Sequence, residues 1–337
     1  MWQLDNKTPF AADAAWIWDC GGGKVWAVAV KATYDIAPDG CTVVSRVQIP
    51  VSRGPRQDEA GVPLGETDLH PFKRRTDILL LGHAHSPLGK RMSELPIGFC
   101  VGKLKREAIV FGDRRWECGA IWLRPGKPKP FVSMPLHWGR AFGGVEPQTG
   151  ESLPNPVGRG LLDAGPDPLL PNIEHPLNRI SRPQDRPEAV GFGPVPGHWH
   201  WRARHAGTYD DAWRAARSPL LPLDIHPDYW QIAPPEQQYP GVLQGGEEIA
   251  LVHLTQPWHS QRPGRLKLVL PALSLRFDTW FYSGAWVCGR SQIHTVILEP
   301  DHPRITVVHL MSLPCVHAEQ LDRTIITIDS KPPATRR

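Results

Sequence analysis

One stretch of this chain, Gly191–Gln238, limits the possible folds most strongly, because it combines rigid aromatic rings with residues that prevent regular structure. It carries Trp199, Trp201, Trp213 and Trp230, together with tyrosines, between prolines. Tryptophan is costly to leave in water, and proline fixes φ and ends helices. We therefore expect an ordered but largely irregular layer pressed onto a core. Such a layer can cover a sheet on one side and offer a binding surface on the other.

A short helix is predicted inside this stretch. Thr208 is a candidate N-cap, and Asp211 completes a Thr-x-x-Asp capping box. Asp210 and Asp211 both favour the positive end of a helix, and Pro219 prevents the helix from continuing. The expected helix is thus short, with two carboxylates at its start.

The rest of the chain shows the period of two that is typical of β-strands. In Lys24–Ile36 (KVWAVAVKATYDI), the side chains of Trp26, Val28 and Val30 are expected to face a sheet core, and the glycines before them supply a hairpin turn. The 31 Gly and 37 Pro residues, about a fifth of the chain against a usual level of about 12%, favour many turns and short strands. Further strands are predicted at Cys41–Val51, Asp77–Leu81, Lys103–Phe111, Ala120–Leu123, Glu247–Leu254, Arg265–Leu270, Leu273–Phe277, Thr295–Leu298, Arg304–Leu310 and Arg323–Asp329.

These patterns predict a mainly β fold of antiparallel sheets packed as a sandwich or a distorted barrel, with one or two short helices. A single domain is expected over residues 2–330. It divides into a β-rich part (2–136), an irregular Pro-, Gly- and Trp-rich layer (137–245) and a second β-rich part (246–330), and residues 331–337 are expected to fray. A compact domain rarely holds so long a region without periodicity unless that region serves a function.

Composition and charge argue against several classes of protein. The net charge of +4 comes from 38 basic and 34 acidic residues spread along the chain, and the longest basic run, Lys73–Arg75, is expected in a solvated loop. Charge therefore gives no reason to predict binding to nucleic acid. No run of about 18 apolar residues predicts a membrane span, and the first residues do not resemble a signal peptide. The six cysteines form no Cys-x-x-Cys pair, so we expect a cytoplasmic protein with free, mostly buried thiols.

Two His-x-His pairs raise a metal hypothesis. His83 with His85, and His198 with His200, place two imidazoles on one face if each segment is a strand, which suits zinc. Neither pair has a carboxylate or cysteine at a useful spacing, and the chain lacks a Gly-x-Ser-x-Gly elbow and a phosphate-binding glycine motif. We predict no catalytic residue, no cofactor and no metal site. A metal-dependent hydrolase built on these pairs is one alternative, and a carbohydrate-binding β-sandwich that stacks tryptophans on sugar rings is another.

Several long motifs resemble the family known as domain of unknown function 2169. The opening Trp-x-Leu-x-Asn-x-Thr-Pro-Phe motif starts at Trp2, and the densest match, AGTYDDAW, covers Ala206–Trp213. The resemblance spans nearly the whole chain, from Trp2 to about Asp329. The other matching motifs are Trp26–Ile36, Thr76–His85, Trp138–Gly144, Asn155–Gly160, Pro219–Asp224 and Ala233–Gln238.

This resemblance implies a bacterial type VI secretion accessory protein that acts as an effector adaptor or chaperone. Similar proteins hold a toxic effector in the cytoplasm and help to mount it on the VgrG/PAAR tip of the injection spike. The family supplies no established catalytic residues, so the resemblance implies a non-enzymatic protein whose partners are a toxic effector, a PAAR protein or VgrG. We expect recognition in the irregular middle of the chain. The residues expected either to touch a partner or to pin the layer to the sheet are Tyr209, Asp210, Asp211, Trp213, Asp224, Trp230, Gln237 and Gln238.

Overall fold

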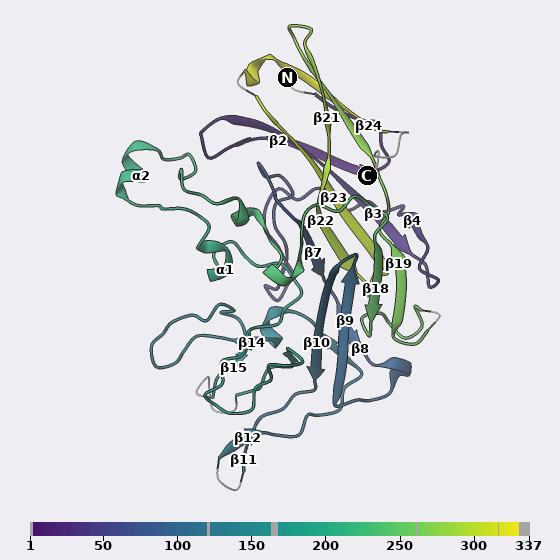
Figure 1. The fold of residues 1–337 in the computed structure, drawn as a ribbon, viewed down its shortest axis with the longest axis vertical. Helices are drawn as coiled ribbons and strands as arrows, with labels where there is room; N and C mark the ends of the chain where they lie inside the picture. Colours follow the sequence, from purple (N-terminus) through teal and green to yellow (C-terminus); the bar gives the residue numbers. More distant parts are fainter. Residues whose placement is uncertain (1–2, 120–121, 163–167, 261, 316, 330–337) are drawn as a thin grey trace.

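A computed structural model describes residues 3–119, 122–162, 168–260, 262–315 and 317–329 (Figure 1). The predicted fold class is confirmed, because the chain is mainly β-strand and its sheets are largely antiparallel. Among the described residues the sheets do not close into a barrel. The molecule is therefore built from open sheets packed on one another.

The longest strand, β3 (Lys24–Ile36), lies in the largest sheet and is covered on both faces. Trp26, Val28 and Val30 enter the main core, as their alternation predicts. Ala27 and Ala29, on the opposite face, join a second and smaller core. The sheet order is β17 (Gln238–Tyr239), β7 (Thr76–Leu80), β22 (Gln292–Glu299), β23 (Arg304–Pro314), β3 and β2 (Ala11–Trp18), with β4 (Thr42–Val44) paired to β3.

Not every strand pair is antiparallel, which corrects one part of the prediction. β7 lies parallel to β22, and β1 (Gln3–Asn6) lies parallel to β24 (Leu321–Ile328). Parallel neighbours need a long crossover connection, which these strands have because they are far apart in the chain. In this way the ends of the chain are joined in one sheet, whose order is β1, β24, β20 (Leu275–Phe281) and β21 (Trp286–Arg290).

A five-stranded sheet contains a central strand that the sequence pattern did not predict. β9 (Glu94–Val101) includes Pro96 and Gly98, both unfavourable inside a strand. Pro96 is tolerated because β18 pairs only with the second half of β9, from Gly98 onward, so no partner on that side needs the missing N–H. The sheet order is β16 (Ile173–Glu174), β10 (Leu104–Phe111), β9, β18 (Glu248–Val252) and β19 (Arg265–Val269).

Several predicted strand boundaries were wrong. The predicted strand Cys41–Val51 is regular only over β4, because Gln48 then binds the backbone of Thr33 with its side-chain amide. Residues 120–121 lie outside the described part of the chain, as does the tail predicted to fray. The remaining strands form pairs: β5 (Arg56–Gln57) with β6 (Pro63–Gly65), β8 (His83–His85) with β13 (Ser133–Pro135), β11 (Trp116–Cys118) with β12 (Leu123–Pro125), and β14 (Phe142–Gly143) with β15 (Arg159–Gly160).

The middle of the chain forms the expected irregular layer with little regular structure. Two short α-helices lie in it, α1 (His200–Ala203) and α2 (Asp211–Ala216). None of the described helices is long and apolar enough to cross a membrane. The 3₁₀ turns of the chain are η1 (Pro87–Gly89), η2 (Trp138–Arg140), η3 (Pro227–Trp230), η4 (Pro235–Gln237) and η5 (Ala318–Gln320).

The six cysteines are all free thiols, as expected, but they are not mostly buried. Cys315 is buried and Cys100 is half-buried, whereas the other four are exposed. The apolar core is filled instead by aliphatic and aromatic side chains.

Candidate partner-binding surface

The α2 lobe, residues 206–224, lies at the outer edge of the irregular layer (Figure 1). Asp210 is the N-cap of α2, because its Oδ1 accepts the N–H of Trp213 at 2.7 Å. The prediction that Thr208 caps this helix was therefore wrong. Thr208 instead donates from its hydroxyl and its N–H to the carboxylate of Asp224, at 2.7 and 3.0 Å. These two hydrogen bonds lower the pKa of Asp224 and close the base of the lobe.

The outer side of the α2 lobe exposes large side chains. Tyr209 is 49% exposed and Leu223 is 70% exposed. The ring of Tyr209 packs edge-on against Trp213, with centroids 4.7 Å apart, and Trp213 Nε1 donates to the carbonyl of Leu220 at 2.9 Å. Exposed aromatic side chains held in place by packing are typical of protein interfaces. Asp210 and Asp211 are both exposed at the start of α2 and supply an acidic rim to this surface, where Asp211 pairs with Arg214.

The lobe rests on the turn of the β2–β3 hairpin. Arg217 donates a hydrogen bond to the carbonyl of Cys20, and Leu220 lies so close to Gly22 that an added Cβ would be 3.0 Å from its Cδ1. At the end of the same hairpin Trp18 is 46% exposed, with the ammonium of Lys24 5.6 Å from its ring centroid. Two neighbouring elements therefore present exposed aromatic rings.

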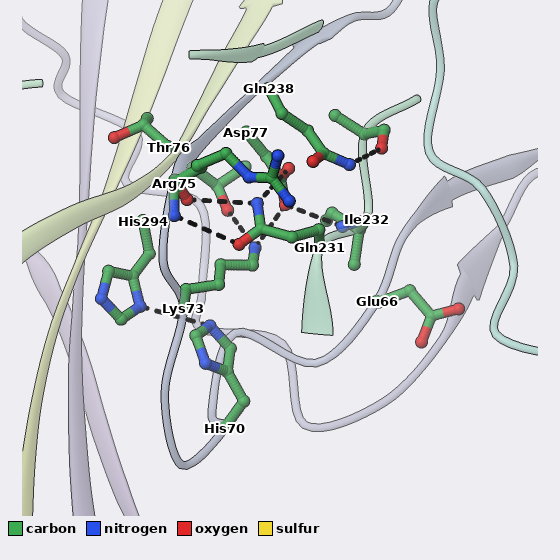
Figure 2. Close-up of polar contacts among 12 residues, drawn as sticks. Glu66, His70, Lys73, Arg75, Thr76, Asp77, Gln231, Ile232, Gln238 and His294 are labelled. Atoms are coloured by element: carbon green, nitrogen blue, oxygen red, sulfur yellow. Dashed lines mark hydrogen bonds and ion pairs between the residues drawn. The ribbon is translucent and has the colours of Figure 1, made fainter. Parts of the chain in front are cut away.

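The layer is pinned to the seven-stranded sheet by a buried carboxylate on β7 (Figure 2). Oδ2 of Asp77 accepts Lys73 Nζ at 2.7 Å and the N–H of Ile232 at 2.7 Å, and Oδ1 accepts Gln231 Nε2 at 2.9 Å. Asp77 has no exposed surface, so its charge is tolerated only because these donors replace water. We call this set of contacts the Asp77 pin.

The basic triplet Lys73–Arg75 is not a solvated loop, contrary to the sequence prediction. Lys73 is 2% exposed and also donates to Thr295 Oγ1 at 3.0 Å. Arg75 is half-buried and pairs with Asp228 at 2.8 Å, which leaves Arg74 as the exposed member. The one local signal for burial was Asp77, four residues after Lys73.

The last three of the predicted contact residues, Trp230, Gln237 and Gln238, belong to this pinned side of the layer. Trp230 stacks on His70 with ring centroids 6.2 Å apart. Gln237 has no exposed surface, and its Nε2 donates to two backbone carbonyls at 2.9 Å each. Gln238 Nε2 donates to the carbonyl of Ala233 at 2.9 Å. Gln237 therefore cannot touch a partner in this conformation, and of the two roles that the sequence left open it has the structural one.

A cluster of tryptophans forms a second anchor of the layer. Trp138 lies with its ring centroid 5.7 Å from that of Trp199 and 5.1 Å from that of Trp201. A Cβ on Gly191 would come within 2.3 Å of the Trp138 ring, which explains the glycine at this position. Trp138 Nε1 shares its proton between two backbone carbonyls at 3.2 and 3.1 Å. The motifs around Trp138 and Trp199, distant in sequence, are thus one packed unit.

The His-x-His pair on β8 meets an acid that is distant in the sequence. β8 places His83 and His85 on one face, as predicted, and Asp301 binds both, at 2.7 Å to His83 Nδ1 and 2.6 Å to His85 Nε2. Burial acts to raise the pKa of Asp301, but these two hydrogen bonds lower it to about 2. The other pair is not in a strand, because His200 begins α1. Within the described part of the chain, no group of three His, Cys, Asp or Glu side chains is placed to hold a metal.

The sequence model of one protein family matches residues 21–309, and its description is "uncharacterized protein conserved in bacteria" (DUF2169). The chain belongs to the DUF2169 family. The match confirms the family resemblance carried by the sequence motifs, and it includes both the α2 lobe and the Asp77 pin of this DUF2169 protein. No curated protein and no solved structure matches the chain.

Proposed function

We propose that this DUF2169 protein is a non-enzymatic adaptor or chaperone of a bacterial type VI secretion system. In the cytoplasm it binds a toxic effector and helps to load it on the VgrG/PAAR spike. The sequence resemblance to effector adaptors supports this role. The structural observation that carries it is an irregular layer that is pinned on its inner side and exposes aromatic side chains on its outer side.

The pins matter for binding because a rigid surface loses little conformational entropy when a partner docks. The Asp77 pin and the tryptophan cluster hold the base of the layer. The α2 lobe then presents Tyr209 and Leu223 outward, as exposed anchors of the kind that carry most interface energy. We therefore assign partner contact to the α2 lobe and support of that surface to the buried residues Gln231 and Gln237.

The proposal assigns no catalytic step to the chain. The cluster of His83, His85 and Asp301 has a structural role in this view, because Asp301 lies in the turn between β22 and β23 and ties that turn to β8. The three side chains thus link strands that are distant in sequence.

The test is capture of partners from the native cell with the tagged full chain, followed by identification of the captured proteins. The proposal expects a toxin, a PAAR protein or VgrG among them. Tyr209→Ala and Leu223→Ala should each lose the partner while keeping the wild-type melting temperature. Trp258→Ala is the matched control, because Trp258 is 77% exposed and lies outside the layer.

Two results contradict the proposal. One is that captured proteins include no component of a secretion spike and no toxin. The other is that each substitution in the α2 lobe that abolishes capture also lowers the melting temperature, which identifies the lobe as scaffold. Gln237→Ala is the reference variant for loss of capture together with a lowered melting temperature, since it removes two buried hydrogen bonds.

A further inference from the structure

A small cavity of about 180 Å³ lies in the irregular layer, between α1, η3 and the segment before β7. Three arginines line it, Arg75, Arg202 and Arg204, and His205 lies beside them. Asp228 is the one acidic side chain among the described lining residues. We call this cavity the arginine pocket.

The charges of the arginine pocket do not cancel. Asp228 pairs with Arg75 at 2.8 Å. Arg202 pairs with Glu66 at 3.2 Å and donates to two backbone carbonyls at 2.9 and 2.8 Å. Arg204 is exposed, and no carboxylate in the described part of the chain lies within ion-pair distance of it. Three guanidinium groups therefore face two carboxylates, which leaves one positive charge uncompensated.

Arg75, one of the residues that line the arginine pocket, also has an unused donor. Arg75 Nε is buried and has no hydrogen-bond partner among the described residues. Figure 2 shows the Arg75 side chain beside Gln231, which also lines the cavity. Burial lowers the pKa of His205, and the positive charge of Arg204 lowers it further. A buried donor without a partner destabilises a protein, and a bound acceptor removes that cost.

We infer that the arginine pocket binds an oxyanion, a carboxylate or phosphate group. The planar guanidinium fork matches the geometry of both groups, and hydrogen bonds to charged acceptors are the stronger kind. The volume suits one such group rather than a whole small-molecule ligand, since ligand pockets are usually about 300–1,000 Å³. Oxyanion binding stands independently of the adaptor role. Assigning the oxyanion to an acidic side chain of a partner rests on the proposed function, and free phosphate is the other source.

A larger cavity of about 430 Å³, beside β8, does not carry the same inference. Its charged lining has more acids than arginines, and each acid already has a partner. The arginines are Arg56 and Arg304, and the acids are Asp58, Glu299 and Asp301. Glu299 binds Arg304, and Asp301 binds two histidines. Asp58 accepts hydrogen bonds from two backbone N–H groups.

The inference is tested by titrating the full chain with inorganic phosphate and, separately, with N-acetylglutamate amide. NMR signals of the Arg75 Nε–H group and the His205 ring should shift and saturate in the millimolar range. Arg204→Gln should weaken binding by about tenfold, because it removes one charge-assisted donor. Arg214→Gln is the matched control, because Arg214 is exposed in the same layer and pairs with Asp211 outside the pocket. Arg204 is exposed, so its variant should keep the wild-type melting temperature.

The two probes separate the sources. Saturation with the glutamate derivative supports an acidic partner side chain, and saturation with phosphate alone supports free phosphate. Shifts that never saturate with either probe, or equal affinities for the two arginine variants, would overturn the inference. Partner capture is measured separately, so an empty pocket with intact capture rejects this inference and leaves the adaptor proposal standing.

Discussion

Replacing Asp77 by alanine should destabilise the protein more than any surface substitution. Asp77 is fully buried and accepts hydrogen bonds from Lys73, Gln231 and Ile232 at 2.7–2.9 Å. Its removal leaves the Lys73 ammonium buried with the hydroxyl of Thr295 as its remaining partner at 3.0 Å. Removing one member of a buried ion pair costs about 3–5 kcal/mol, because the other charge is left without compensation.

The magnitude is large enough to measure by melting. The entropy of unfolding is about 2.1 cal/mol/K per residue, so it is about 0.7 kcal/mol/K for a chain of 337 residues. A loss of about 4 kcal/mol then lowers the melting temperature by about 6 °C. Gln231 and Ile232 are two of the three donors that lose their acceptor in Asp77→Ala. In this variant, backbone N–H groups of residues 231–238 should therefore also exchange hydrogen faster than those of β3.

Two further variants make the Asp77 prediction specific. Lys73→Met combined with Asp77→Leu should recover much of the loss, because no buried charge then lacks a partner. Asp211→Ala, an exposed acid on α2, should change stability by less than about 0.5 kcal/mol. If the free energy of unfolding of Asp77→Ala lies within about 1 kcal/mol of the wild-type value, the Asp77 pin does not hold the layer.

Three other outcomes are expected. Val28→Asp should cost at least about 4 kcal/mol in urea unfolding, because Val28 is fully buried and the new charge has no partner; an unchanged midpoint would mean that the strand register is wrong. Burial lowers the pKa of His294 to about 3 and of His309 to about 4, whereas the pKa of an unfolded histidine is about 6.5. At a pH between the folded and the unfolded pKa, the unfolded state therefore binds more protons than the folded state. The free energy of unfolding should therefore fall as pH drops from about 6.5 toward about 4, by up to about 1.4 kcal/mol per pH unit for each histidine, and His309→Leu should reduce that slope. Elemental analysis should find no stoichiometric zinc; about one metal per chain, lost in a His83→Ala, His85→Ala double variant, would favour the metal-dependent hydrolase instead.

The strand pattern was predictable where neighbouring residues carried it. The alternation in β3 placed Trp26, Val28 and Val30 in the main core because successive side chains of a strand point to opposite faces. The same rule failed for β9, where Pro96 and Gly98 hide the pattern and only the pairing of neighbouring strands makes the segment regular. Local composition therefore predicted the class of fold better than its strand boundaries.

The candidate surface was predictable in its location and less so in its details. The density of tryptophan and proline placed an ordered irregular layer in the middle of the chain, and the α2 helix lies inside it. The role of each residue was not visible. Gln237 and Tyr209 are both polar residues of that stretch, yet one is fully buried and the other is half exposed. The difference depends on which side of the layer faces the sheet.

The sequence alone determined a mainly β chain with a packed Trp- and Pro-rich layer, because period, turn residues and rigid rings act over a few residues. Only the tertiary structure decided which charged groups are buried. Asp77 meets Gln231 across 154 residues, and His83 meets Asp301 across 218. Lys73 accordingly resembles a solvated lysine in the sequence and becomes a buried cation in the fold. A buried charge is stable only beside its partner, and that partner comes from a distant segment that no local pattern specifies.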